Sequence, residues 1–242
     1  MSVLFVSDLH LDAGSPEIGD QFIRFLRQRA SNADALYILG DLFESWVGDD
    51  DPQPERERLA TELTALKRAG VDCFFMHGNR DFLVGEQFAA AAGVELLDEE
   101  VVLDVSGTKV LIMHGDSLCT DDVEYQAFRA TVRDAAWQEN FLQLPLQQRL
   151  ALAVQAREHS QARNATAADF IMDVNQNAVA EALRRHGVHH LLHGHTHRPD
   201  VHRFELDKQP AVRMVLGDWY DQGSVLEWDA AGPRLESLPR QA

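Results

Sequence analysis

The sequence contains little cysteine and no long apolar run. Cys73 and Cys119 are its only cysteines, too few and too far apart for a disulfide framework or a Cys-x-x-Cys zinc site. No stretch approaches the roughly 18 apolar residues that a membrane-spanning helix needs. Residues 1–6 have neither the basic leader nor the apolar length of a signal peptide. We therefore expect a protein of a reducing compartment, soluble or peripherally bound to a membrane.

Positive charge is also scarce. Lys and Arg total 22 against 39 Asp and Glu, which gives a formal net charge of −17. Binding to duplex nucleic acid depends chiefly on clustered Lys and Arg, so we expect no nucleic-acid partner. An anionic substrate would need local positive charge from a few Arg side chains or from metal ions.

Short apolar runs alternate with segments of helical spacing in the first third of the chain. Residues 3–6, 35–39 and 71–76 are runs typical of buried strands, and apolar residues recur at helical spacing over 18–26 and 59–66. This alternation predicts an α/β fold with parallel strands. Residues 101–105 and 109–113, separated by a Gly-containing turn, predict a β-hairpin.

Strand patterns disappear between residues 121 and 177, where the sequence is helical in pattern and broken mainly by Pro145. We therefore predict a core formed by residues 1–120 and 178–242, with a helical insertion over 121–177. Within the insertion, Arg149, Arg157 and Arg163 form a local basic group that we expect to face anionic lipid headgroups.

Polar residues follow the predicted strands where each strand ends. Open α/β sheets bind ligands beyond the carboxyl ends of their strands, so these residues predict a shared site. With two neighbouring histidines they form the candidate metal-ligand set: Asp8, His10, Asp41, Asn79, His114, His195 and His197. Two divalent cations about 3.5–4 Å apart can share one bridging carboxylate. Ligation by carboxylate, amide and imidazole favours Mn²⁺, Fe²⁺ or Zn²⁺ over Ca²⁺ or Mg²⁺.

These motifs resemble those of the calcineurin-like metallophosphoesterases, in the order D-x-H, G-D, G-N, H and G-H-x-H. The resemblance implies a four-layer α-β-β-α sandwich, with the insertion as a cap. The usual third motif is G-N-H, whereas this chain has Gly78-Asn79-Arg80. Arg is a poor general acid but a good two-donor phosphate clamp.

The G-N-R variant, with Gly40-Asp41-Leu42-Phe43-Glu44 and Gly194-His195-Thr196-His197-Arg198-Pro199, resembles the UDP-2,3-diacylglucosamine hydrolases of lipid A synthesis. That resemblance implies hydrolysis of a pyrophosphate bond to UMP and 2,3-diacylglucosamine 1-phosphate. It also implies a lipid-linked UDP-sugar substrate and peripheral attachment to the anionic cytoplasmic face of the inner membrane. We expect a monomer with two Mn²⁺ ions per chain, other divalent metals being possible.

The resemblance also assigns roles to individual residues. One metal would be bound by Asp8, His10, Asp41 and His197, and the other by Asp41, Asn79, His114 and His195. Catalytic roles would fall to Asp41, Arg80 and His195, and substrate contacts to Asn79, Arg80, Asp122, Ser160, Asn164 and His195. Relatives commonly have a Lys where this chain has Ala167, so one phosphate contact is expected to be missing.

Other interpretations of these residues stay open from the sequence. Arg80 could form a salt bridge with Asp81, and His186, His189, His190 and His202 could be ordinary polar loop residues. The insertion's apolar side chains could pack on the core instead of lining a groove for acyl chains; these are Trp137, Phe141, Leu142, Leu144, Leu146, Leu150, Leu152, Val154, Phe170 and Ile171. Alternative functions are another metallophosphoesterase activity, on a nucleoside diphosphate compound, a cyclic nucleotide or a phosphoprotein, or a non-catalytic scaffold of the same fold.

Overall fold

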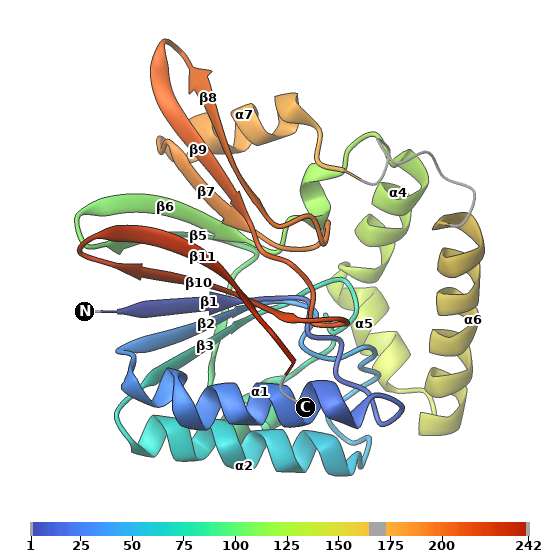
Figure 1. Ribbon diagram of the computed structural model, residues 1–242. Helices are drawn as coiled ribbons and strands as arrows, with labels where there is room; N and C mark the ends of the chain where they lie inside the picture. The colour runs from blue at the N-terminus through green and yellow to red at the C-terminus, as the bar shows by residue number, and fades with distance from the viewer. Residues whose placement is uncertain (1, 165–172, 241–242) are drawn as a thin grey trace.

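The computed structural model describes residues 2–164 and 173–240, with only the backbone of 161–164. Two β-sheets stack face to face with helices on their outer faces (Figure 1). The predicted four-layer α-β-β-α sandwich is therefore confirmed.

The first sheet has the strand order β11-β10-β1-β2-β3-β4. Its parallel strands are β1 (Val3–Val6), β2 (Ala35–Leu39), β3 (Asp72–Met76) and β4 (Glu95–Leu97), and β10 (Gly223–Asp229) and β11 (Gly232–Leu238) extend it in antiparallel fashion. All of β1 is buried, as its uninterrupted apolar run requires for a strand covered on both faces.

The second sheet has the order β5-β6-β7-β9-β8. Its strands are β5 (Glu100–Val105), β6 (Thr108–Met113), β7 (His190–His193), β8 (Asp200–Leu206) and β9 (Gln209–Val215). The predicted hairpin is β5–β6, joined by Ser106 and Gly107 at φ 52° and 85°. Two successive left-handed residues suit the tight turn between antiparallel strands.

Helices cover both outer faces of the sandwich. On the first sheet lie α1 (Pro16–Gln28), α2 (Pro54–Arg68) and α3 (Glu86–Ala92), and α7 (Gln176–His186) lies on the second. Short 3-10 turns span Ala30–Asn32 and Asp116–Leu118. One apolar core joins α1, α2 and α3 to the first sheet, and another joins the facing sides of the sheets to α7.

The remaining helices, α4 (Val123–Val132), α5 (Ala135–Leu142) and α6 (Leu146–Asn164), form a group beside the sandwich (Figure 1). We call these three helices the cap. Trp137, Leu144 and Leu150 pack against the core of the first sheet. Among the described residues, no helix is long and apolar enough to cross a membrane.

One expectation for the insertion is wrong. Arg149 does not face lipid headgroups, because its side chain is buried, with 2% of the residue exposed, and is paired with Asp50. It also donates to the carbonyl of Leu144 at 3.0 Å. Arg149 therefore attaches the cap to the core. Arg163 lies outside the residues whose side chains are described.

Candidate metal centre

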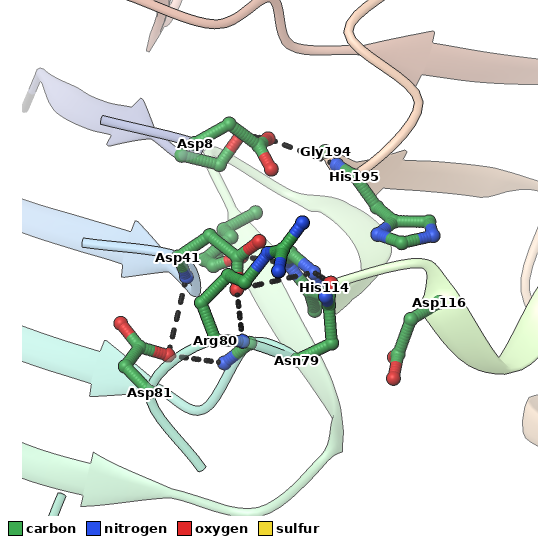
Figure 2. Close-up of polar contacts among 12 residues, drawn as sticks. Asp8, Asp41, Asn79, Arg80, Asp81, His114, Asp116, Gly194 and His195 are labelled. Carbon is green, nitrogen blue, oxygen red and sulfur yellow. Dashed lines mark hydrogen bonds and ion pairs between the residues drawn. The ribbon is translucent and has the colours of Figure 1, made fainter. Parts of the chain in front are cut away.

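The ends of neighbouring strands bring the predicted ligands together. Asp8 follows β1, Asp41 follows β2, Asn79 follows β3, His114 follows β6, and His195 follows β7. Figure 2 shows these side chains gathered at one end of the sandwich. Side chains far apart in sequence thus meet in one place because their strands are adjacent and point the same way.

Most of the ligand positions have unusual backbone geometry. Asp8, His10, Asp41, His195 and His197 have φ values of 54°, 52°, 51°, 68° and 55°. A left-handed backbone is rarely adopted by residues other than glycine and clusters at functional sites. The surrounding structure therefore holds these side chains in place at some cost in stability.

A first group of ligand atoms surrounds Asp8. His10 Nε2 lies 3.1 Å from His197 Nε2 and 3.9 Å from Asp41 Oδ2, and His197 Nε2 lies 3.5 Å from Asp8 Oδ1. The other oxygen of Asp8, Oδ2, accepts a hydrogen bond from the His195 backbone N–H at 2.9 Å. That bond leaves Asp8 Oδ1 directed at the imidazole nitrogens.

A second group contains Asp41, His114 and His195. His114 Nε2 lies 3.7 Å from Asp41 Oδ1 and 3.0 Å from Asn79 Oδ1. Asp41 directs Oδ1 toward His114 of this group and Oδ2 toward His10 of the first group, so its carboxylate lies between the two groups.

Three of the histidines are oriented from behind. His114 Nδ1 lies 2.9 Å from the Leu39 carbonyl oxygen, His10 Nδ1 lies 2.9 Å from Glu44 Oε2, and His197 Nδ1 lies 3.3 Å from Asp218 Oδ2. The His114 contact is a hydrogen bond, and a carbonyl acceptor at Nδ1 leaves the Nε2 lone pair for a metal. The His10 and His197 contacts are ion-pair distances to a carboxylate. Glu44 and Asp218 were not predicted as site residues, although both follow the end of a strand.

Asp81 shapes the loop that presents Asp41. Its buried carboxylate accepts hydrogen bonds from the backbone N–H groups of Gly78, Asp41, Leu42 and Phe43 at 2.8, 3.2, 2.7 and 3.3 Å. Burial and the neighbouring Asp41 raise the pKa of Asp81 to about 6. The Asp81 carboxylate therefore binds backbone N–H groups. It does not form the salt bridge with Arg80 that the sequence left open.

Glycine is required where strand-end loops meet. A Cβ on Gly78 would lie 2.1 Å from Asp41 Oδ1, and a Cβ on Gly194 would lie 2.2 Å from Asp8 Oδ2. Any larger residue would collide with a ligand carboxylate. These collisions explain why glycine stands beside the ligand in the G-N and G-H-x-H motifs.

The chemistry of the side chains in both ligand groups fits divalent cations. Asp8 Oδ1 is buried, and no described donor is in hydrogen-bonding geometry with it. Burial and the neighbouring His114 lower the pKa of His195 to about 4, so this imidazole is neutral at pH 7. Buried carboxylates beside imidazole nitrogens are typical ligands of metals such as Mn²⁺, Fe²⁺ and Zn²⁺.

A cavity of about 790 Å³ lies between the metal centre and the cap. Its polar end contains Asn79, Arg80, Tyr125 and Ser160. The apolar lining comes from both core and cap: Trp46, Val47, Phe82, Leu83, Phe128, Val132, Trp137, Phe141, Leu144, Leu152, Ala153 and Ala156. The other lining residues are polar or charged and include Glu44 and four arginines. The cavity therefore offers a large apolar surface together with charged groups, which suits a ligand that has both an apolar and an anionic part.

The predicted apolar groove residues fall into three sets where they are described, and two of the residues are not described. Trp137, Phe141, Leu144 and Leu152 line the cavity, and Leu146 and Leu150 pack on the core. Leu142 and Val154 are exposed and not among the lining residues. Phe170 and Ile171 lie outside the described residues.

Arg80 differs from the other arginines of the cavity. Arg129 is paired with Asp116, Arg133 with Glu99, and Arg157 with Glu44. Within residues 2–164 and 173–240, no described carboxylate lies within ion-pair distance of the Arg80 guanidinium. Arg80 is therefore the available cation at the polar end of the cavity.

Of the other predicted substrate-contact residues, Asp122 has a described side chain and Asn164 does not. Asp122 is buried and caps α4 by accepting from the Tyr125 backbone N–H at 2.9 Å, and it is not among the cavity residues. The Asn164 side chain and Ala167 lie outside the described residues. Substrate binding by Asp122 and Asn164 stays a prediction.

The sandwich and its strand-end ligands define a metal-dependent phosphoesterase. The sequence model of the calcineurin-like phosphoesterase family matches residues 1–199, and the chain belongs to this family.

Three relatives align with this chain over nearly its whole length. A protein of Serratia proteamaculans (strain 568) is 53% identical over 239 residues, covering 99% of this chain and 100% of the relative. Proteins of Stenotrophomonas maltophilia (strain K279a) and Escherichia coli O7:K1 (strain IAI39) are 50% and 52% identical, covering 100% and 99% of this chain and 100% of each relative. All three relatives are named UDP-2,3-diacylglucosamine hydrolase.

Proposed function

We propose that this protein hydrolyses the pyrophosphate bond of UDP-2,3-diacylglucosamine, releasing UMP and 2,3-diacylglucosamine 1-phosphate. The observation that carries this proposal is the direct connection of the metal centre, through Asn79 and Arg80, with a cavity of mainly apolar lining. A diacylated UDP-sugar needs a phosphate site next to a lipid site. The names of the full-length relatives support the same substrate.

The metal centre would hold two divalent ions, which we propose to be Mn²⁺. Asp8, His10, Asp41 and His197 would bind one, and Asp41, Asn79, His114 and His195 the other. When bound, such a pair supplies Lewis-acid polarisation of the phosphate and an activated water. The chain's own contribution is to hold Asp41 between the two ligand groups and to keep His195 neutral.

Arg80 would bind the equatorial phosphate oxygens. Its guanidinium lines the cavity and has no described ion-pair partner. Its backbone N–H donates to Asp41 Oδ1 at 2.8 Å, which fixes the residue beside the bridging carboxylate. A planar two-donor clamp suits the charge that develops on phosphate in the transition state.

The helical insertion of residues 121–177 would be the cap of this enzyme and would hold the acyl chains against the core. Each CH₂ transferred from bilayer to water costs about 0.8 kcal/mol, so the enzyme needs an apolar surface beside the metals. Leu144 and Leu152 of the cap, and Trp46 and Phe82 of the core, supply such a surface. Ser160 on the same lining would contact the polar part of the substrate.

We also propose that a monomer associates peripherally with the cytoplasmic face of the inner membrane. Val123 and Phe128 on α4 are exposed apolar side chains, and such side chains can insert into a lipid interface. The net charge of −17 supports the absence of a nucleic-acid partner.

The experiment compares two substrates of the purified protein reconstituted with Mn²⁺. We expect UMP release from UDP-2,3-diacylglucosamine, its loss on chelation with EDTA, and little release from UDP-N-acetylglucosamine, which lacks the two long acyl chains. Failure to release UMP from the lipid substrate would contradict the proposal. Equal rates on both substrates would instead indicate a soluble nucleotide hydrolase with the same metal centre.

A further inference from the structure

The proposed substrate has three chemical parts, and the structure accounts for two. The metal centre suits the pyrophosphate, and the cavity on the Asn79 and Arg80 side suits the acyl chains. The nucleoside is joined to the pyrophosphate, so it has to lie beside the metal centre. His10 and His197 of the metal centre are not among the residues that line the cavity, so their side of the metal centre is the candidate for the nucleoside.

An exposed aromatic ring lies on that side of the metal centre. The Tyr220 ring is stacked on the His10 ring, with centroids 5.2 Å apart and an interplanar angle of 8°, and its centroid is 5.9 Å from that of His197. Tyr220 is not among the residues that line the cavity. It therefore lies beside the first ligand group but outside the space assigned to the lipid.

Local hydrogen bonds hold Tyr220 in this position. Its backbone N–H donates to Asp218 Oδ1 at 3.0 Å, and its carbonyl accepts from Arg240. Asp218 also faces His197 Nδ1 at 3.3 Å. The loop that orients a predicted metal ligand thus also fixes the ring beside the metal centre.

Tyr220 is only partly covered by the protein. One face of its ring lies against His10, and 45% of the residue is exposed. Among the large apolar and aromatic side chains that the structure describes, the other aromatic one with such exposure is Phe128 at 47%, and Phe128 lines the cavity. Nucleobases stack on exposed aromatic rings through their π-faces.

We propose that Tyr220 is the stacking platform for the uracil base of the substrate and of the UMP product. The base would complete a stack with Tyr220 and His10, with its phosphate directed at the metal centre. This inference rests on the proposed function, because it assumes a uridine nucleotide. It predicts a nucleobase site that is separate from the lipid cavity.

Equilibrium binding of UMP to the Mn²⁺-loaded protein tests this site without turnover. Ribose 5-phosphate is the matched ligand, since it has the sugar and phosphate but no base. We expect Tyr220→Ala to weaken UMP binding about 5-fold to 150-fold, the range for one base stacked on an aromatic side chain, and to leave ribose 5-phosphate binding unchanged. Tyr220→Phe and Tyr220→Trp should retain UMP binding, as should Phe128→Ala.

Two results would overturn the inference. One is equal binding of UMP and ribose 5-phosphate by the parent protein, and the other is unchanged UMP binding by Tyr220→Ala. Steady-state kinetics give a second measurement: KM for UDP-2,3-diacylglucosamine should rise in Tyr220→Ala but not in Tyr220→Phe, and an unchanged KM contradicts the site. UMP release from the lipid by the parent protein tests the proposed function separately, so the two failures can be distinguished.

Discussion

Glu44 Oε2 lies 2.9 Å from His10 Nδ1, so an acidic side chain that is not itself a predicted ligand lies directly behind a histidine of the first ligand group. The other oxygen of the same carboxylate is paired with Arg157 of the cap helix α6. Both Glu44 and Arg157 also line the cavity. One carboxylate thus connects the metal centre with the wall of the proposed lipid site.

Replacing Glu44 should weaken metal binding. Loss of an acceptor behind a ligating histidine typically costs 10-fold to 100-fold in metal affinity, and we expect Glu44→Ala to lose about that much for Mn²⁺. Titration of the metal-free protein with Mn²⁺ measures the effect. Glu57→Ala, on the exposed side of α2, is the control and should bind Mn²⁺ like the parent.

Arg157 should act on the metal centre through Glu44. We expect Arg157→Ala to lower Mn²⁺ affinity by a few-fold, because the freed carboxylate no longer holds His10 in one orientation. The double variant Glu44→Ala/Arg157→Ala should bind Mn²⁺ as weakly as Glu44→Ala alone, since coupled residues give non-additive effects. Additive losses would indicate that the cap and the metal centre are independent.

Arg80→Lys should be damaging although it keeps the positive charge. A point ammonium cannot reproduce the planar two-donor clamp of a guanidinium. We expect a loss of about 1.5–3 kcal/mol in transition-state stabilisation, the range for hydrogen bonds to charged groups. Measured kcat/KM gives this loss directly, and Mn²⁺ content should stay at the parent level. A kcat/KM equal to that of the parent would exclude a phosphate clamp.

A pair of substitutions on α6 separates the cavity from the outer surface. Leu152 and Val154 are exposed by 44% and 56%, but only Leu152 lines the cavity. We expect Leu152→Asp to raise KM for the diacylated substrate in detergent micelles, because a carboxylate in the cavity opposes acyl binding. Val154→Asp should leave KM unchanged. An equal rise in KM for both variants would indicate that the surface of α6 contacts the micelle and that the cavity does not bind the acyl chains.

The parts of the fold predicted from sequence are those with continuous apolar runs. β1, β2 and β3 are short buried strands, and the β5–β6 hairpin has a turn that needs left-handed residues. The buried strand β10 was not predicted, and neither were the edge strands β4, β8 and β11. Many side chains of the edge strands are exposed or half-buried, so these strands lack the continuous apolar signal of a buried strand.

The candidate site was predictable to the extent that it depends on local motifs. Asp8, Asp41 and His195 stand directly after strands, and parallel neighbours bring such positions together. The orienting contacts of Glu44 and Asp218, and the pairing of Arg149 with Asp50, are set by packing between distant segments. The local balance of charged residues along the sequence does not reveal such pairs. The expectation for Arg149 was wrong for this reason.

In the proposed function, one metal centre joined by Asp41 hydrolyses the substrate. The most direct test measures metal content and UMP release from UDP-2,3-diacylglucosamine on the same preparation of Asp41→Ala. Because Asp41 faces ligands of both groups, at 3.9 Å from His10 and 3.7 Å from His114, we predict loss of metal from both positions together with loss of activity. A variant that keeps its metal and releases UMP within about tenfold of the parent rate, a difference of about 1.4 kcal/mol, would contradict the account.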